Sequence, residues 1–131
     1  MSNKTNHSKQ DTLLNKTYKM QQTAAALGFK WPNSIAIFNK LNEEAIELAT
    51  AIEKKDLVNI KEEIGDLFFT VINFCCLLNI DPNTALEHAS KKFERRFTHV
   101  KKIARKNNIN MALSSLAELQ ALWQRAKQSE K

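Results

Sequence analysis

Two long runs of apolar residues, spaced at alternating steps of three and four, constrain the fold of this chain more than any other feature. Such spacing lines up one side chain per turn on a single helix face, as in helices that pack along a seam. Only a short break around Lys54, Lys55 and Asp56 separates the two runs. The sequence therefore predicts an antiparallel hairpin of two long helices. Its expected seam residues are Phe38, Leu41, Ala45, Leu48 and Ile52, followed by Leu57, Ile60, Ile64, Leu67, Val71, Cys75 and Leu78.

A shorter helix is expected before the hairpin. Asp11 is a candidate N-cap for a helix over about 12–27, and Gly28 is suited to end that helix. The Pro in the following "WPNS" segment discourages helix at the residue before it. We therefore expect a turn there, with Asn33 or Ser34 capping the first hairpin helix.

Two more helices are expected after the hairpin. Asp81 followed by Pro82 has the pattern of an N-cap and a first helical residue, and opens an apolar-periodic stretch through Ile103. Ser115 and Glu118 have the spacing of a capping box ahead of a last helix. With only two Gly and two Pro in 131 residues, the chain offers little material for strands and tight turns. We predict an all-α antiparallel bundle of about four to five helices.

The length suggests one folded domain, which we place at residues 12–131, with residues 1–11 expected to be disordered. No apolar run approaches the roughly 20 residues that span a bilayer, and the N-terminal segment lacks the apolar middle of a secretory signal. A cytoplasmic protein without a membrane partner is therefore expected. The adjacent Cys75 and Cys76 lie in an apolar run and suit buried thiols better than a disulfide or zinc site.

Four carboxylates are expected to converge on one side of the hairpin. At about 100° per residue, Glu44 and Glu47 lie about 60° and 120° from the seam at Leu41, and Glu63 and Asp66 repeat these offsets relative to Ile60. The two-fold symmetry of an antiparallel pair brings equal offsets to the same side. Both pairs are also equally far along the chain from the break, so their heights match.

Four clustered carboxylates repel one another unless a cation neutralises them. An all-oxygen set suits Mg²⁺, with Mn²⁺ as a possible substitute, because zinc prefers His or Cys. The alternative is that these acids are ordinary exposed residues paired with nearby lysines such as Lys40, Lys54, Lys55 or Lys61. The matched angles and heights favour the metal site. Glu43 and Glu62 point further from the seam and are expected to be solvated.

Positive charge is concentrated in residues 91–106, which contain eight Lys and Arg and one Glu within a chain of net charge +6. One interpretation is a helical module that binds nucleic acid without catalysis, in which case affinity would fall steeply with salt. The spacing of Phe93 and Phe97 places both on the expected core stripe, however, so aromatic contact with bases is not indicated. We do not expect a nucleic-acid partner.

The acidic phrases "EEAIE" and "EEIGDLFF", the following Asn73, "KFERRF" and a late "WQRAK" together resemble the MazG family of nucleoside triphosphate pyrophosphohydrolases. The resemblance covers about three-quarters of the chain, from "GFKWP" onward, and is greatest to the C-terminal domain of two-domain members. It implies an all-α enzyme that hydrolyses nucleoside triphosphates to the monophosphate and pyrophosphate with Mg²⁺, in nucleotide-pool housecleaning. A related substrate such as dUTP or phosphoribosyl-ATP is the alternative within this class.

The resemblance also implies roles for individual residues. The metal ligands and catalytic residues would be Glu44, Glu47, Glu63 and Asp66, and the substrate-binding residues would be Asn73, Lys92, Arg96, Trp123 and Lys127. Other readings stay open, because Trp123 suits a core, Lys127 a solvated tail and Asn73 a buried amide that bridges helices. The apolar hairpin exceeds what so few helices can cover, so a homo-oligomer, dimer or larger, is expected.

Overall fold

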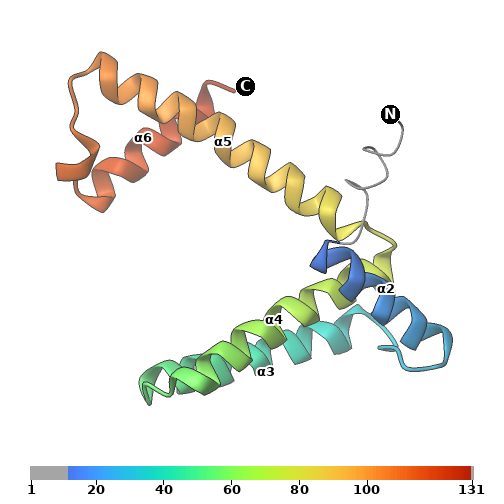
Figure 1. Ribbon diagram of the computed structural model, residues 1–131. Coiled ribbons are helices and arrows are strands. Elements are labelled where there is room, and N and C mark those ends of the chain that lie inside the picture. Colours follow the sequence, from blue (N-terminus) through green and yellow to red (C-terminus); the bar gives the residue numbers. More distant parts are fainter. Residues whose placement is uncertain (1–11, 131) are drawn as a thin grey trace. The chain divides into compact units, whose positions relative to one another are not determined.

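The computed structural model describes residues 12–130, and all regular structure in that range is helical (Figure 1). The elements are α2 (Leu13–Ala26), α3 (Ser34–Glu53), α4 (Leu57–Leu78), α5 (Pro82–Lys106), the 3₁₀ turn η1 (Met111–Leu113) and α6 (Leu116–Gln128). The predicted all-α class with five packed helices is confirmed. The helices form two compact units, the first ending at Ala85 and the second beginning at Leu86. The single domain expected over 12–131 stays a prediction.

Most helix ends follow the capping residues read from the sequence. Asn33 caps α3 as predicted. Asp56, which is expected from the sequence only to lie in the break between the two helices, caps α4 by accepting a hydrogen bond from the Asn59 backbone N–H at 3.2 Å. Ser115 and Glu118 form the predicted reciprocal capping box at α6. The cap of α2 is Thr12, whereas the predicted Asp11 lies, like the rest of residues 1–11, outside the described residues.

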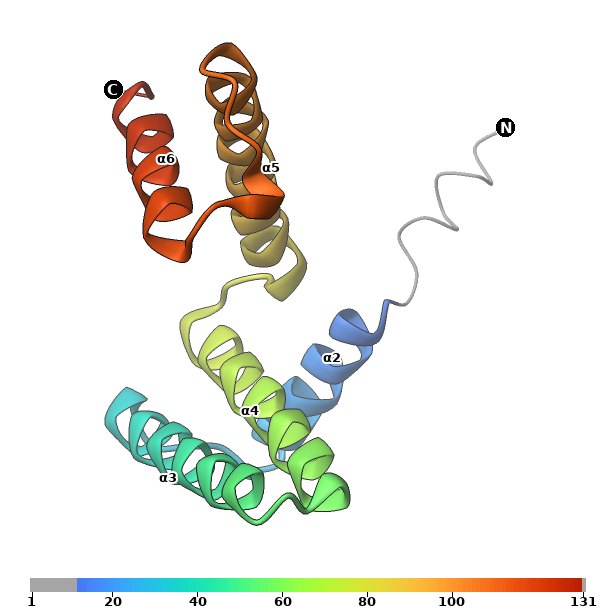
Figure 2. The same cartoon turned by 90° about the vertical axis from the view of Figure 1, so that its left-hand side faces the viewer.

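In the first unit, α3 and α4 form the predicted hairpin and lie side by side in both views (Figures 1 and 2). α2 packs against α4. Two hydrogen bonds join these helices: Gln21 Nε2 donates to the Phe69 carbonyl oxygen at 3.0 Å, and the Cys76 thiol donates to the Tyr18 carbonyl at 3.6 Å. Cys75 is buried and Cys76 half-buried, and both are free thiols as expected.

The packing seam of the hairpin differs from the predicted one. Leu41, Leu48, Ile60 and Leu67 are partly buried, and Cys75 is buried, as expected. The other predicted seam residues are exposed, namely Phe38, Ala45, Ile52, Leu57, Ile64, Val71 and Leu78. Their places are taken by residues on the neighbouring helix face: Ile37, Glu44 and Ala51 in α3, and Glu63 and Thr70 in α4. The prediction failed because apolar spacing identifies an apolar helix face but does not show whether that face packs within the same chain.

In the second unit, α6 packs on the C-terminal part of α5. Val100 and Ala104 of α5 and Leu122 and Ala126 of α6 form its buried core. The prediction that Phe93 and Phe97 are buried is wrong, since they are 55% and 36% exposed. They lie on the same stripe as Val100 and Ala104, two turns and one turn earlier, but outside the buried core, and the ring centroid of Phe93 is 5.4 Å from that of Trp123, which packs against this core.

Large apolar side chains also remain exposed on the hairpin. Phe38, Ile46, Ile52 and Phe68 are each more than half exposed. Among the described helices, none alone has the length and apolar character needed to cross a membrane, whereas α4 and α5 taken as one bent pair pass on length and composition only.

Candidate active site

Three of the four predicted metal ligands come together between α3 and α4. Glu44 of α3 and Glu63 and Asp66 of α4 each offer a carboxylate oxygen, and these oxygens all lie within 4.8 Å of one another. Glu44 and Glu63 face into the hairpin and are only 4% and 8% exposed, while Asp66 is exposed at the edge. The fourth predicted ligand, Glu47, is exposed and lies outside this group of three. Its carboxylate nevertheless contributes to raising the pKa of Glu63.

The environment of Glu63 favours its protonated form in the absence of a cation. Burial, together with the neighbouring carboxylates of Glu44 and Glu47, raises the pKa of Glu63 from 4.5 to about 7. In Glu44 the opposite effect wins, because Lys40 Nζ lies 3.0 Å from its Oε1 and lowers the pKa despite burial. The pKa values of the two buried carboxyls are therefore shifted in opposite directions.

Lys40 partly bears out the alternative reading of the acidic residues. It forms ion pairs with Glu44 at 3.0 Å and with Glu43 at 3.7 Å, as expected for acids paired with nearby lysines. Glu43 is exposed and fits that reading fully. Glu44 does not, because it is buried and Lys40 reaches only one of its two oxygens.

Two buried oxygens at this site lack any hydrogen-bond partner among the described residues: Glu44 Oε2 and Glu63 Oε2. Buried polar atoms without partners are uncommon in folded proteins, and an ordered water or a bound ion is a common way to satisfy them. Carboxylate oxygens gathered this closely are the ligands that Mg²⁺ and Mn²⁺ prefer. The residues present therefore fit a divalent cation.

The raised pKa of Glu63 predicts the pH dependence of stability in the metal-free protein. Between pH 4.5 and about 7, folded Glu63 keeps a proton that the unfolded chain has already released. The free energy of unfolding should therefore fall as pH rises through this window and level off above it. Urea denaturation in EDTA at several pH values will measure this slope. Glu63→Gln should flatten it, and an unchanged slope in that variant would contradict the assignment.

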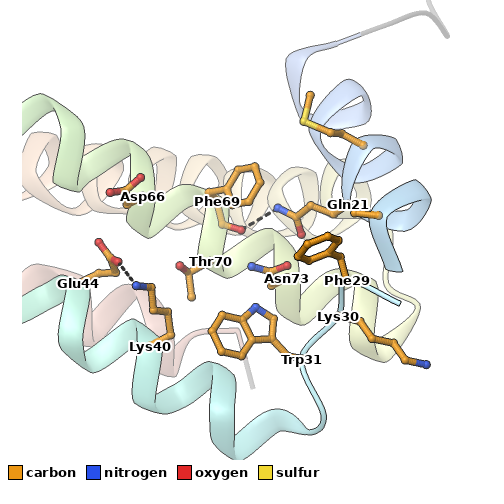
Figure 3. Close-up of a pocket in the computed structure, with 12 residues that line it drawn as sticks. Gln21, Phe29, Lys30, Trp31, Lys40, Glu44, Asp66, Phe69, Thr70 and Asn73 are labelled. Carbon is orange, nitrogen blue, oxygen red and sulfur yellow. Dashed lines mark hydrogen bonds and ion pairs between the residues drawn. The ribbon is translucent and has the colours of Figure 1, made fainter. Parts of the chain in front are cut away.

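A cavity of about 700 Å³ lies beside the acidic group (Figure 3). Its volume is within the range of small-molecule sites. Its walls come from α2, α3, α4 and the segment between α2 and α3, and are formed by Met20, Gln21, Ala24, Phe29, Lys30, Trp31, Lys40, Glu44, Asp66, Phe69, Thr70 and Asn73. Asn73, predicted to bind substrate, thus lines the same cavity as Glu44 and Asp66.

Several of these cavity residues were not identified from the sequence as site residues. The sequence indicates Lys40 only as a surface partner of the acids, and it carries no motif that marks Gln21 or Thr70 as site residues. Phe29 and Trp31 belong to the "GFKWP" segment, with which the resemblance to the family begins. The sequence signal for these two cavity residues is an aromatic pair in the turn before the helix that carries Glu44.

The other predicted substrate-binding residues belong to the second unit. Arg96 lies beside Trp123, with its guanidinium carbon 5.9 Å from the ring centroid, and its Nε donates to Glu130 at 2.9 Å. Trp123 is partly buried and packs against the core of this unit. Lys92 and Lys127 are exposed. The structure brings Arg96 and Trp123 together, and the nucleotide contacts of all four residues stay predictions.

Comparison with known proteins agrees with these features. Residues 33–101, more than half of the chain, match the MazG nucleotide pyrophosphohydrolase domain. The matched range contains all four predicted metal ligands, together with Asn73, Lys92 and Arg96, and ends before Trp123 and Lys127.

Individual relatives are similar over most of the chain. It is 33% identical over 109 residues to the nucleoside triphosphate pyrophosphohydrolase/pyrophosphatase MazG of Thermotoga maritima. The matched residues are 83% of this chain and 42% of that protein. It is 31% identical over 119 residues to the nucleoside triphosphate pyrophosphohydrolase of Escherichia coli K12. These residues are 89% of this chain and 45% of that protein. The chain thus spans less than half the length of these two relatives. Because the domain match covers more than half of the chain, including the whole helical hairpin and its acidic residues, the chain belongs to the MazG nucleotide pyrophosphohydrolase domain family.

Proposed function

We propose that this protein hydrolyses nucleoside triphosphates between the α- and β-phosphates, releasing a nucleoside monophosphate and pyrophosphate. One observation carries the proposal: the carboxylates of Glu44, Glu63 and Asp66 converge beside a cavity of about 700 Å³ in a chain of the MazG family. A role in clearing altered nucleotides from the cellular pool would suit such an enzyme, and the cytoplasmic location expected from the sequence stays a prediction.

Glu44, Glu63 and Asp66 would hold the divalent cation, with Glu47 as a fourth ligand at the exposed edge. Mg²⁺ is the proposed ion, and Mn²⁺ the substitute, on the strength of the all-oxygen donor set and the two unpartnered buried oxygens. When bound, the ion would polarise the phosphates and make a water molecule more acidic.

The protein's own side chains would position the reactants. Glu44 or Glu47 is the carboxylate proposed to orient the attacking water toward the α-phosphorus. Lys40, which already lies on the cavity wall, holds Glu44 ionised and ready to accept a hydrogen bond from that water.

For the second unit we propose the roles implied by its side chains. Lys92, Arg96 and Lys127 would neutralise negative charge on the phosphates, and Trp123 would contact the nucleotide. The placement of the Arg96 guanidinium next to the Trp123 ring supports a shared role for these two.

A panel of canonical, deoxy and modified nucleoside triphosphates, incubated with Mg²⁺, tests the proposal. Pyrophosphate and orthophosphate must be measured separately. We expect pyrophosphate in equal amount to monophosphate, and none in EDTA. Release of orthophosphate alone would mean that a different bond is broken. The same panel, extended with dUTP and phosphoribosyl-ATP, covers the alternative substrates of this class. Nucleic-acid binding through residues 91–106 gains no support from the family match and is not proposed.

We also propose that the protein works as a dimer or larger homo-oligomer. Phe38, Ile46 and Phe68 are 54%, 67% and 66% exposed on the hairpin of a single chain, and exposed apolar surface of this kind marks an interface. Light scattering should give at least twice the monomer mass at micromolar concentration. Charged substitutions such as Ile46→Glu should lower that mass, and a wild-type protein that is strictly monomeric would contradict the proposal.

A further inference from the structure

Gln21 presents a buried hydrogen-bond acceptor that the protein itself leaves unused. Its side chain is the buried one of α2 and is 6% exposed. Nε2 donates to the Phe69 carbonyl oxygen at 3.0 Å, while Oε1 has no partner among the described residues. Because a backbone carbonyl can only accept, the amide must turn its NH₂ end toward Phe69. Oε1 is therefore fixed as an acceptor on the other side of the amide.

Gln21 lies on the wall of the cavity described above, away from the acidic group. Figure 3 shows Glu44 and Asp66 toward one end, Gln21 and Phe29 toward the other, and Trp31, Thr70 and Asn73 between them. Along α4, Phe69, whose carbonyl binds Gln21, is three residues from Asp66 and Asn73 is seven, which is about 4.5 Å and about 10 Å at 1.5 Å per residue. Phosphates held at the acidic end would thus leave room for a base at the Gln21 end.

The walls near Gln21 suit a planar ring. Phe29, Trp31 and Phe69 supply aromatic surface to the cavity. Aromatic side chains stack on any base and so give affinity without selectivity. Selectivity between bases must come from a polar group at the edge of the ring. A buried protein group without a partner discriminates most strongly, because a base that cannot bond to it leaves it unpaired.

We propose that Gln21 Oε1 accepts a hydrogen bond from the exocyclic amino group of the base. The inference rests on the proposed function, since it places the phosphates at the carboxylates. On the edge remote from the sugar, cytosine and adenine carry an amino group, whereas uracil and hypoxanthine carry a carbonyl oxygen. An oxygen facing Oε1 would bring two acceptors together without a proton. Cytosine and adenine nucleotides are therefore favoured over their oxo counterparts.

Binding of α,β-methylene triphosphates to the full chain with Mg²⁺ tests this, because these analogues resist cleavage at the proposed bond. By calorimetry, the cytidine analogue should bind about tenfold or more tightly than the uridine analogue, and the adenosine analogue likewise against the inosine analogue. Equal affinities within both pairs, or no measurable binding of any of the four, would overturn the inference.

Two variants on the same helix locate the effect. Gln21→Met keeps the side-chain length but removes the acceptor, and should reduce both affinity ratios to about one or two. Gln22→Met is the matched control, because Gln22 is exposed and should leave the ratios unchanged. A preference that persists in a folded Gln21→Met protein would assign selectivity to another residue.

A ligand series on the unaltered protein decides the matter if Gln21→Met does not fold. The pyrimidin-2-one riboside analogue lacks any group at the 4-position, and should bind more weakly than the cytidine analogue but more tightly than the uridine analogue. Binding equal to that of cytidine would show that the amino group is not read. Parallel turnover assays separate the two claims: selective binding without pyrophosphate release defeats only the proposed reaction, and pyrophosphate release without selectivity defeats only the role of Gln21.

Discussion

Asp66→Ala should lower Mg²⁺-dependent pyrophosphate release at least about 100-fold while the protein stays folded. Asp66 supplies one of the three carboxylate oxygens that lie within 4.8 Å of one another, so its removal leaves the cation with an incomplete set of ligands. The side chain is exposed, in contrast to the buried Glu63 on the previous turn of α4. Truncation at Asp66 therefore opens no cavity and separates loss of metal from loss of structure.

The matched control is Glu62→Ala, which removes an exposed carboxylate from α4 one residue away from Glu63 and outside the acidic group. It should keep nearly full activity. Both variants should be compared by circular dichroism and by the rise in melting temperature on adding Mg²⁺, which Asp66→Ala should lose and Glu62→Ala should retain. A folded Asp66→Ala protein with wild-type turnover would remove Asp66 from the metal site.

The helices themselves could be predicted because their signals are local. Caps act within one turn, so Asn33 and the Ser115/Glu118 box mark helix starts whatever the rest of the chain does. The convergence of Glu44, Glu63 and Asp66 was also predictable, since it follows from helix geometry and the short break between α3 and α4.

The depth of the carboxylates could not be predicted in the same way. Angular offsets from an assumed seam placed Glu44 and Glu63 on its flank, but the helices meet on the face that carries these two residues. Which face is buried depends on all packing partners together, including α2 and any second subunit. Gln21 illustrates the same limit, because its contact with Phe69 joins positions 48 residues apart.

The register of the seam predicts the largest effect on stability. Ile37→Ala should lower the free energy of unfolding by about 2–5 kcal/mol, because Ile37 is 0% exposed and the lost methylene groups would leave a cavity in the first unit. Phe38, which the apolar spacing places in the seam, is 54% exposed in the single chain. Phe38→Ala should therefore cost less within one chain, despite removing a larger side chain.

The two variants should also differ in how their effects depend on protein concentration. If the exposed face around Phe38 binds a second subunit, the loss caused by Phe38→Ala will grow where the wild type is associated and shrink on dilution, whereas the loss caused by Ile37→Ala will persist at all concentrations. Urea denaturation over a hundredfold range of concentration will separate these cases. A larger loss for Phe38→Ala than for Ile37→Ala in the dilute monomer would restore the seam predicted from apolar spacing, and would place Glu44 and Glu63 back on its flank.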